Sequence, residues 1–325
     1  MIVTHMIAAA LMLATTPVIA QPNQMQSEAV PLVPSDPQAS TDEVSIGRDH
    51  DRMTVDVSVV GKGPYRFLVD TGAERTVISR QLADRLNLSS GKAAILHSVV
   101  GVNDVQTVFI PHLQVSGNVI SVVDAPKLEA SNIGADGMLG IDSLRSQRVL
   151  FDFKANTMSI TPSNQPAAKM DGDTIVVRAK TRNGRLIFTQ AEIDGQPVTV
   201  IVDTGSEVSI GNLALQKALQ RKHMIRLPDP TVIESVTGEK LSANVAQIRQ
   251  LSIGGVRLDE LNVAFANAHI FNQLDLNRKP TLLLGMNAMR AFDRISIDFA
   301  AKKVRFVLPG TSMRPSYRLA VLAAR

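Results

Sequence analysis

The most constraining feature of this sequence is a four-residue motif, Val-Asp-Thr-Gly, that occurs twice and ends an apolar run each time. The first copy lies in FLVDTGAERTVIS, residues 67–79, and the second in VIVDTGSEVSIGN, residues 200–212. Their aspartates, Asp70 and Asp203, are 133 residues apart (203 − 70). This distance is far longer than the period of a solenoid repeat and indicates a duplicated domain.

Two further pairs of segments match between the halves. DGMLGIDSLRSQRVLFDFKANTMSI begins at residue 136, and TLLLGMNAMRAFDRISIDFAAKKVRF begins at residue 281. Their shared Leu-Gly pairs end in Gly140 and Gly285. Between motif and matched glycine, HSVVGVNDVQT aligns with ESVTGEKLSAN, and each has a serine three residues before a glycine, Gly101 or Gly238. We therefore expect two halves with the same internal order.

The composition and the spacing of apolar residues predict an all-β fold. Apolar residues make up 45% of the chain, aromatic residues only 4%, and there is no Trp, so the core rests on aliphatic side chains. These occur in short runs rich in β-branched residues and separated by turn signals such as GKGP, RNG and DGQP. Helical spacing is found after each motif, at residues 79–88 and 212–222. One short helix is therefore expected in each half.

These patterns divide the chain into segments. A first lobe is expected at residues 45–162, a polar linker with two prolines at 163–172, a second lobe at 173–309, and a basic tail at 310–325. Residues 1–20 resemble a secretory signal cleaved after Ala20, and the Pro/Gln/Ser-rich residues 21–44 a disordered lead-in. The alternative for the first segment is an uncleaved membrane anchor, because no Lys or Arg precedes its apolar part.

A cleaved signal predicts a periplasmic or secreted protein with no stable membrane insertion. The absence of cysteine excludes a disulfide framework, a thiol nucleophile and cysteine-based zinc sites. The formal net charge of +4 comes from scattered residues, which argues against nucleic-acid binding. The six histidines show no metal-type spacing, and no phosphate-binding or dinucleotide motif occurs. No metal and no cofactor are therefore expected.

The position of the two aspartates indicates their chemistry. An ionised carboxylate at the end of a buried strand is costly unless it is hydrogen-bonded or paired. A single Asp-Thr-Gly would most simply be a turn. Two copies in matched halves that pack about a pseudo-twofold axis bring the carboxyl groups together, where they share one proton. One aspartate then accepts a proton from water while the other protonates the substrate, which is peptide hydrolysis without a metal.

The motifs quoted above resemble those of the aspartic proteases, specifically the retroviral-type or retropepsin-like branch. The resemblance runs from about residue 51 to residue 308. It implies a two-lobed acid-protease fold of pseudo-twofold-related, barrel-like β-lobes, and an endopeptidase acting on extended protein or peptide substrates. Because both lobes lie in one chain, it implies a monomer in place of a homodimer. The only tyrosines, Tyr65 and Tyr317, lie outside the expected flaps, unlike the flap tyrosine of pepsin-type enzymes.

The resemblance also implies roles for individual residues. The catalytic residues would be Asp70 and Asp203. Supporting residues would be Thr71, Gly72, Thr204 and Gly205, with Gly140 and Gly285 in the strands beneath. Candidate flap or substrate-binding residues are Ala73, Glu74, Ser206, Glu207, Gly101 and Gly238. The residue after the motif glycine differs between the halves: it is Ala73 in the first and Ser206 in the second. A serine hydroxyl could hydrogen-bond one carboxylate only, which predicts a pH optimum less acidic than that of a gastric enzyme.

Two alternatives remain open. The duplicated halves could form a peptide-binding or scaffolding module whose aspartates are catalytically idle, although both Asp-Thr-Gly segments are intact. Each half could also pair with another chain, so that the active unit is a dimer.

Asp152 and Asp298, which precede phenylalanines at expected strand ends, are interpreted as structural turn residues.

Overall fold

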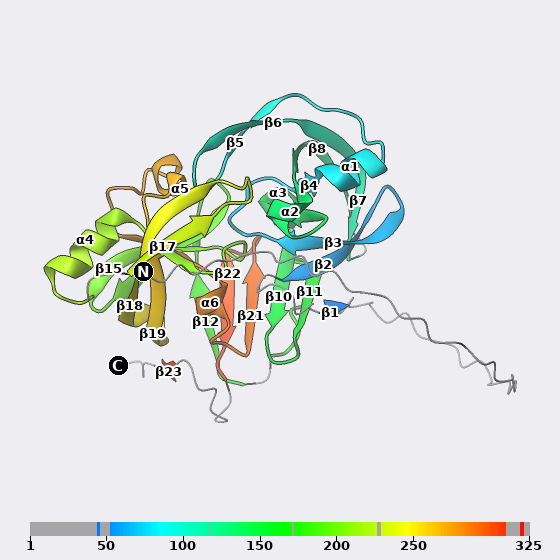
Figure 1. The fold of residues 1–325 in the computed structure, drawn as a ribbon. Coiled ribbons are helices and arrows are strands. Elements are labelled where there is room, and N and C mark those ends of the chain that lie inside the picture. Colours follow the sequence, from blue (N-terminus) through cyan, green and yellow to red (C-terminus); the bar gives the residue numbers. More distant parts are fainter. Residues whose placement is uncertain are drawn as a thin grey trace, which may run out of the picture.

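The chain folds into two β-lobes joined by a common sheet (Figure 1). A computed structural model describes residues 44–45, 53–116, 118–170, 172–225, 229–309 and 319–321. The predicted signal segment, most of the lead-in and most of the basic tail lie outside these residues. Within the described part of the chain, none of the helices has both the length and the apolar character needed to cross a membrane.

The first lobe is a closed six-stranded barrel. Its strands are β2 (Thr54–Val59), β3 (Lys62–Val69), β4 (Val77–Ser79), β7 (Thr107–Val115), β8 (Asn118–Leu128) and β9 (Gly137–Leu139). They pair in the order β2-β3-β9-β4-β8-β7, and β7 pairs back to β2. β3 and β9 are parallel, as are β4 and β8, whereas β9 and β4 are antiparallel.

The second lobe repeats this order strand for strand. Its strands are β14 (Arg185–Ile193), β15 (Gln196–Val202), β16 (Ser209–Gly211), β18 (Lys240–Ile253), β19 (Val256–Phe265) and β20 (Thr281–Leu284). The order is β14-β15-β20-β16-β19-β18, with β18 pairing back to β14. Three strands extend it: β13 (Lys180–Arg182), β17 (Asp229–Glu234) and β23 (Leu319–Val321). The all-β, two-lobed fold predicted from the duplicated motif is confirmed.

A six-stranded antiparallel sheet joins the lobes and takes three strands from each half. They are β1 (Val44–Ser45), β10 (Gln147–Asp152), β11 (Thr157–Pro162), β12 (Thr174–Arg178), β21 (Arg294–Asp298) and β22 (Lys303–Val307). β10 of the first half pairs with β21 of the second. In that register Arg148 lies opposite Asp298, and their side chains form a buried ion pair at 3.1 Å. Asp152 lies opposite Arg294 in the same register and forms a partly exposed ion pair with it at 3.1 Å, so both aspartates link the two halves.

Six short helices complete the described lobes. The two predicted helices are α1 (Arg80–Arg85) and α4 (Leu213–Arg221). Ser79 and Asn212 cap their N-termini by accepting backbone N–H groups. Four more helices were not predicted: α2 (Ala130–Ile133), α3 (Ile141–Leu144), α5 (His269–Gln273) and α6 (Met286–Met289). They have four or five residues each, too few for a helical spacing of apolar residues to show in the sequence.

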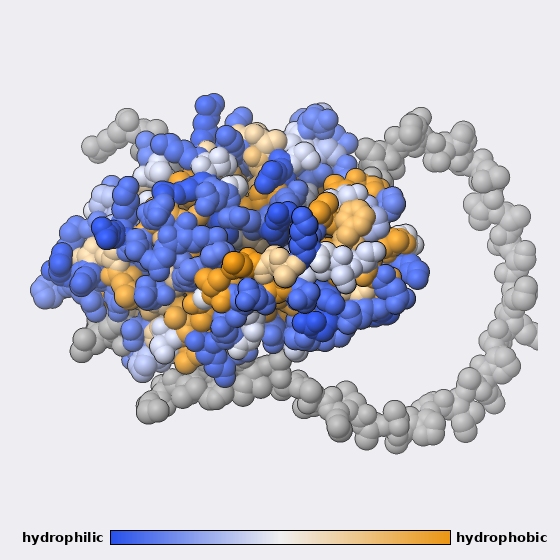
Figure 2. Space-filling model, turned by 90° about the horizontal axis from the view of Figure 1, so that it is seen from above, coloured by the Kyte–Doolittle hydropathy of each residue, from blue (hydrophilic) through white to orange (hydrophobic). Residues whose placement is uncertain are grey.

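Each lobe also carries a β-hairpin that reaches toward the other lobe. The first hairpin consists of β5 (Ala94–His97) and β6 (Val102–Val105), and the second of β17 and the start of β18. We call them flap 1 and flap 2. Seen from above the view of Figure 1, most of the surface is hydrophilic, and apolar residues lie in separate patches (Figure 2). Ile95 and Val102 on flap 1 are 64% and 49% exposed, because a hairpin arm has only one covered face.

Candidate active site

The two motif aspartates follow equivalent strands. Asp70 comes directly after β3 and Asp203 directly after β15. Each is held by its own backbone N–H, which donates to the last carbonyl of the parallel neighbouring strand: Asp70 to Leu139 at 3.0 Å, and Asp203 to Leu284 at 3.1 Å. The matched Leu-Gly segments noted in the sequence thus lie beside the motifs, and their carbonyls fix the backbone position of each motif aspartate.

The two threonines link the motif loops of the opposite lobes. The backbone N–H of Thr71 donates to Oγ1 of Thr204 at 3.1 Å, and Thr204 N–H donates to Thr71 Oγ1 at the same distance. Each hydroxyl also donates across the interface, Thr71 to the carbonyl of Val202 at 2.9 Å and Thr204 to that of Val69 at 2.7 Å. All four bonds are buried. A threonine hydroxyl can donate and accept at once, which is why this residue type can close the network.

The motif glycines let each loop pack against the opposite carboxylate. A Cβ placed on Gly72 would lie 2.5 Å from Oδ1 of Asp203, and one on Gly205 would lie 2.2 Å from Cγ of Asp70. Side-chain carbons do not approach other atoms this closely. The two loops therefore interlock, and any residue larger than glycine would push them apart.

The two carboxylates have unequal surroundings. Oδ1 of Asp70 accepts backbone N–H groups from Gly72 at 2.7 Å and Ala73 at 3.0 Å, whereas Asp203 accepts one, from Gly205 at 3.0 Å. Asp203 is 7% exposed. Burial, followed by the adjacent charge of Asp70, raises the pKa of Asp203 to about 8. Burial therefore favours the protonated form of Asp203, while the two backbone donors favour the ionised form of Asp70.

Comparison with protein families gives two matches, one for each lobe. Residues 55–146 match the aspartyl protease family found in gag polyproteins, and residues 189–288 match a second aspartyl protease family. The chain belongs to the retropepsin-like aspartyl proteases. A comparison with curated proteins gave no significant match. The resemblance inferred from the repeated motif is thus confirmed, with both protease lobes in one chain.

One detail of the sequence interpretation of this aspartyl protease is wrong. The hydroxyl of Ser206 was expected to hydrogen-bond the adjacent carboxylate and lower its pKa. Instead it donates to the carbonyl of Val208 at 2.7 Å, so it stabilises the turn of its own loop. The two carboxyl groups differ because Asp203 is more deeply buried and because Asp70 accepts more backbone N–H groups. One of these N–H groups belongs to Ala73.

Gly140 and Gly285 were expected within the strands beneath the protease loops, but each follows its strand and precedes a short helix, α3 or α6. A Cβ on Gly140 would lie 2.4 Å from the backbone of Arg75, and one on Gly285 would lie 2.5 Å from that of Val208. These glycines therefore let the motif loop pass close over the start of the helix.

Two pairs of residues that brace the motif loops were not predicted from the sequence. Asp142 accepts hydrogen bonds from the N–H and hydroxyl of Thr76, at 2.9 and 2.7 Å. In the other lobe Oδ1 of Asn287 accepts from the N–H and hydroxyl of Ser209, at 2.9 and 2.8 Å. The signal was present in the matched segments, because Asp142 and Asn287 each stand two residues after the matched glycine.

A buried arginine, also missed, connects the second lobe to the first motif loop. Arg185 is 4% exposed, and its guanidinium donates to the carbonyl of Gly72 at 2.7 Å and to Glu74 at 2.6 Å. The bond to Glu74 uses the carboxylate considered as a substrate-binding group. Arg185 precedes Asp203 by 18 residues (203 − 185), and Arg52 precedes Asp70 by the same number (70 − 52). This repeated spacing is the sequence signal that could have identified Arg185. Arg52 itself lies outside the described residues.

The predicted flap glycines lie in the hairpin turns. Gly101 lies in the turn of flap 1 and Gly238 in that of flap 2. The turn of flap 2 is one residue longer, since His97 pairs with Val102 but Glu234 pairs with Lys240. Residues beyond the two glycines are therefore offset by one from the sequence alignment. Ser206 and Glu207 remain at the motif loop, where their carbonyls accept from the start of α6 at 2.8 and 3.0 Å.

The flap tips cross to the opposite lobes. Val99 of flap 1 packs against an apolar cluster of the second lobe, and Val236 of flap 2 packs against a cluster of the first lobe. The N–H of His269, at the start of α5, donates to the carbonyl of Val99 at 2.8 Å. The rings of His97 and His269 stack and are joined by a hydrogen bond of 2.8 Å. No sign of this contact appears in the spacing of the six histidines along the chain.

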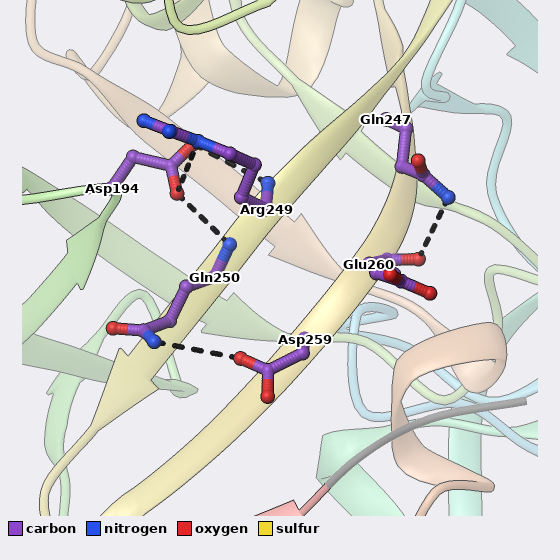
Figure 3. A pocket seen from close by; sticks show the side chains of 6 residues that line it. All are labelled: Asp194, Gln247, Arg249, Gln250, Asp259 and Glu260. Atoms are coloured by element: carbon purple, nitrogen blue, oxygen red, sulfur yellow. Dashed lines mark hydrogen bonds and ion pairs between the residues drawn. The ribbon is translucent and has the colours of Figure 1, made fainter.

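A hollow of about 770 Å³ lies at the far end of the second lobe (Figure 3). Asp194, at the opposite end of β15 from Asp203, lies on one side of it and accepts the backbone N–H of Gln250 at 2.9 Å. Gln250 in turn donates to Asp259 at 3.5 Å. The polar groups shown in this hollow bond mainly to one another, so it offers little to a ligand. In the described part of the chain no group of three or more His, Asp and Glu side chains could hold a metal ion.

Proposed function

We propose that this aspartyl protease is an endopeptidase that uses Asp70 and Asp203 as its catalytic dyad. The observation that carries the proposal is the placement of the two carboxyl groups beside each other by interlocked loops. Negative charge on Asp70 is stabilised by the N–H groups of Gly72 and Ala73. The pKa of Asp203, raised to about 8 by burial and by Asp70, keeps this residue protonated at neutral pH.

In the proposed reaction Asp70 is the base and Asp203 the acid. Asp70 removes a proton from a water molecule held between the carboxyl groups, and that water attacks the peptide carbonyl carbon. Asp203 gives its proton to the carbonyl oxygen as the tetrahedral intermediate forms. The C–N bond then breaks as the leaving nitrogen receives a proton from the dyad. As the C=O bond of the new carboxyl group re-forms, one hydroxyl of the intermediate returns its proton to the dyad, and two peptides leave.

The proposed substrate is a protein segment in extended conformation, bound between the flaps and the dyad by pairing with flap strands. Each flap strand offers a row of backbone groups on one edge, which suits any sequence in the β conformation. Together with the N-terminal segment that resembles a secretory signal, this mode of binding supports an enzyme that processes a periplasmic or exported protein. The proposed enzyme is a monomer. The inter-lobe sheet and the threonine network support one chain as the active unit.

The test is digestion of a mixed peptide library by the wild-type chain, Asp70→Asn and Asp203→Asn. We expect the wild type to cut peptides internally and both variants to lose roughly 10²–10⁴-fold in rate, because each removes one of the two proton-transferring groups. Asp56→Asn, which replaces an exposed aspartate on β2, is the matched control and should retain full activity. Equal cleavage by all variants, or no cleavage at any pH, would favour the alternative, an idle peptide-binding module.

The pH dependence of cleavage follows from the shared proton. Activity should fall on the alkaline side as Asp203, whose pKa is about 8, loses its proton. On the acid side it should fall as the dyad takes up a second proton. We therefore expect a bell-shaped profile with its maximum between weakly acidic and neutral pH, measured as kcat/KM on one peptide. A maximum near pH 2 would contradict this assignment.

A further inference from the structure

Flap 1 bridges the surroundings of the two motif loops, reaching from the first lobe toward α5 of the second (Figure 1). Ala94 and Leu96, in its first strand, pack against the same apolar cluster as Ala73, the residue after the first motif. Val99, at its tip, packs against the same cluster of the second lobe as Val208, which follows the second motif. A substrate bound between the flaps and the dyad, as proposed above, must enter past this bridge.

The base of flap 1 is interrupted, whereas that of flap 2 is not. β6 ends at Val105 and β7 begins at Thr107, so Gln106 lies between two strands, and β5 and β6 form a sheet of their own. In flap 2 the corresponding strand, β18, runs unbroken from Lys240 to Ile253 into the barrel of the second lobe. Flap 1 can therefore turn about its base without breaking a barrel strand, and flap 2 cannot.

Both ends of the flap 1 arm are internally fixed. Below the break, the hydroxyl of Thr107 donates to the carbonyl of Lys92 at 2.5 Å, and Asp124 accepts the N–H of Lys92 at 3.1 Å. At the tip, the N–H of Ser98 donates to the carbonyl of Gly101 at 2.8 Å and closes a tight turn. Motion is therefore expected to turn the arm as a unit about its base.

Three contacts hold flap 1 against its neighbours. The N–H of His269, the first residue of α5, donates to the carbonyl of Val99 at 2.8 Å. The amide of Asn103 donates to Glu239 of flap 2 at 3.2 Å. Nδ1 of His97 lies 2.8 Å from Nε2 of His269, with the ring planes 11° apart. Of these contacts, only the one between the two imidazoles has a partner that ordinarily changes charge between about pH 5 and pH 8.

We propose that flap 1 is the gate of the cleft and that His97 and His269 form a proton-sensitive latch that holds it closed. While one of the two facing nitrogens lacks a proton, it accepts a hydrogen bond from the other. Once both rings are protonated, both facing nitrogens carry hydrogen and both rings are positive, so the bond is lost and the rings repel each other. The latch should hold at neutral pH and release as the pH falls toward about 5. The inference adds regulation to the proposed cleft, and it rests on the proposed function only where cleavage is concerned.

The surrounding charges modify the latch but do not replace it. Within the described part of the chain neither histidine forms an ion pair. The charged residues on the elements around the latch are Asp104 of flap 1, Glu239 of flap 2, and Asp275, Arg278 and Lys279 after α5. The carboxylates favour proton uptake by the histidine pair, and the two cations oppose it. None of them lies between the two facing nitrogens, which are in direct contact.

Flap 2 has no corresponding pair of histidines. Glu234 stands at the position of His97 and pairs in the strand register with Lys240. A Cβ placed on Gly238, in the turn of flap 2, would lie 3.0 Å from the amide nitrogen of Asn132 on α2, and an amide does not titrate. Proton uptake between about pH 8 and pH 5 should therefore release one flap only.

The test is pulsed EPR on the full chain, in which the absence of cysteine allows spin labels at two chosen positions. Val100→Cys at the tip of flap 1, paired with Lys217→Cys on α4, reports the gate. Lys240→Cys on flap 2, paired with Arg85→Cys on α1, reports the other flap. Between pH 7.5 and pH 5 we expect a longer distance to appear for flap 1, with an open-to-closed ratio raised at least about fivefold by the lost hydrogen bond. The flap 2 distance should not change.

Variants of the latch separate proton uptake from other effects of pH. His269→Lys places a permanent positive charge beside His97 and should give the longer flap 1 distance already at pH 7.5. Adding His97→Glu to that variant supplies the opposite charge and should restore the short distance at both pH values. His112→Gln, which replaces an exposed histidine on β7, is the matched control and should behave as the wild type.

The distances are measured without substrate, so the latch and the peptidase can fail separately. A wild-type flap 1 distance that is the same at pH 7.5 and pH 5 would overturn the latch and leave the peptidase standing, and this result needs no variant to fold. An unchanged distance in His269→Lys would overturn it as well. If the distances change as expected but no peptide is cleaved, the proposed function fails and the latch remains.

Discussion

Replacing Asp203 by asparagine is expected to slow cleavage by roughly 10²–10⁴-fold and, at the same time, to stabilise the fold at neutral pH. The pKa of Asp203 is about 8 in the folded chain because of burial and the charge of Asp70, against an ordinary value of ~3.9 in the unfolded chain. Between these values the folded state holds a proton that the unfolded state releases, so wild-type stability falls as pH rises from about 4 to about 8. Asparagine binds no proton and escapes this loss.

The expected gain is about 2–4 kcal/mol at pH 7, and it should vanish below about pH 4, where Asp203 is protonated in both states. Urea unfolding of both proteins between pH 4 and 8 measures it. Asp298→Asn is the matched control, since it also changes a buried aspartate. Burial raises the pKa of Asp298, but hydrogen bonds from Ser163, Ala301 and Arg148 outweigh this and lower it. That variant should lose stability at neutral pH. A gain for Asp203→Asn that is independent of pH would refute the proton assignment.

Gly205→Ala should inactivate the enzyme although both aspartates remain. The new Cβ would lie 2.2 Å from Cγ and 2.3 Å from Oδ2 of Asp70. That carboxylate cannot simply turn away, because the N–H groups of Gly72 and Ala73 hold it. The two loops must separate, which stretches the hydrogen bonds between Thr71 and Thr204. We expect at least about a hundredfold loss of kcat/KM and a destabilisation of about 1–3 kcal/mol.

Gly255→Ala is the control for this change. Gly255 lies in the turn between β18 and β19, and an added Cβ there would come no closer than 3.7 Å to Ile175. This variant should retain activity and differ from the wild type by only a few tenths of a kcal/mol. If Gly205→Ala cleaves peptides at the wild-type rate, the loops do not need the close approach that the structure shows.

Much of the fold could be predicted because the duplication is written twice in the chain. Two Val-Asp-Thr-Gly motifs, each followed by a matched Leu-Gly, indicated paired lobes and placed Asp70 and Asp203 at equivalent strand ends. The helices α1 and α4 were visible because they are long enough to show helical spacing and begin at a capping residue, Ser79 or Asn212. The helices α2, α3, α5 and α6 were not, since about one turn leaves no period to detect.

The sequence by itself determined the duplication into two β-lobes, the family and the positions of the two motif aspartates. Only the tertiary structure decided how the lobes differ. Arg185 and Glu74, Asn103 and Glu239, and His97 and His269 are each more than 100 residues apart, and they meet because the lobes face one another. Ser206 bonds its own turn and leaves Asp203 to be protonated by burial. Local sequence patterns indicate which strand a residue occupies. The protonation and the ion pairs of a side chain depend on neighbours that folding brings from the other lobe.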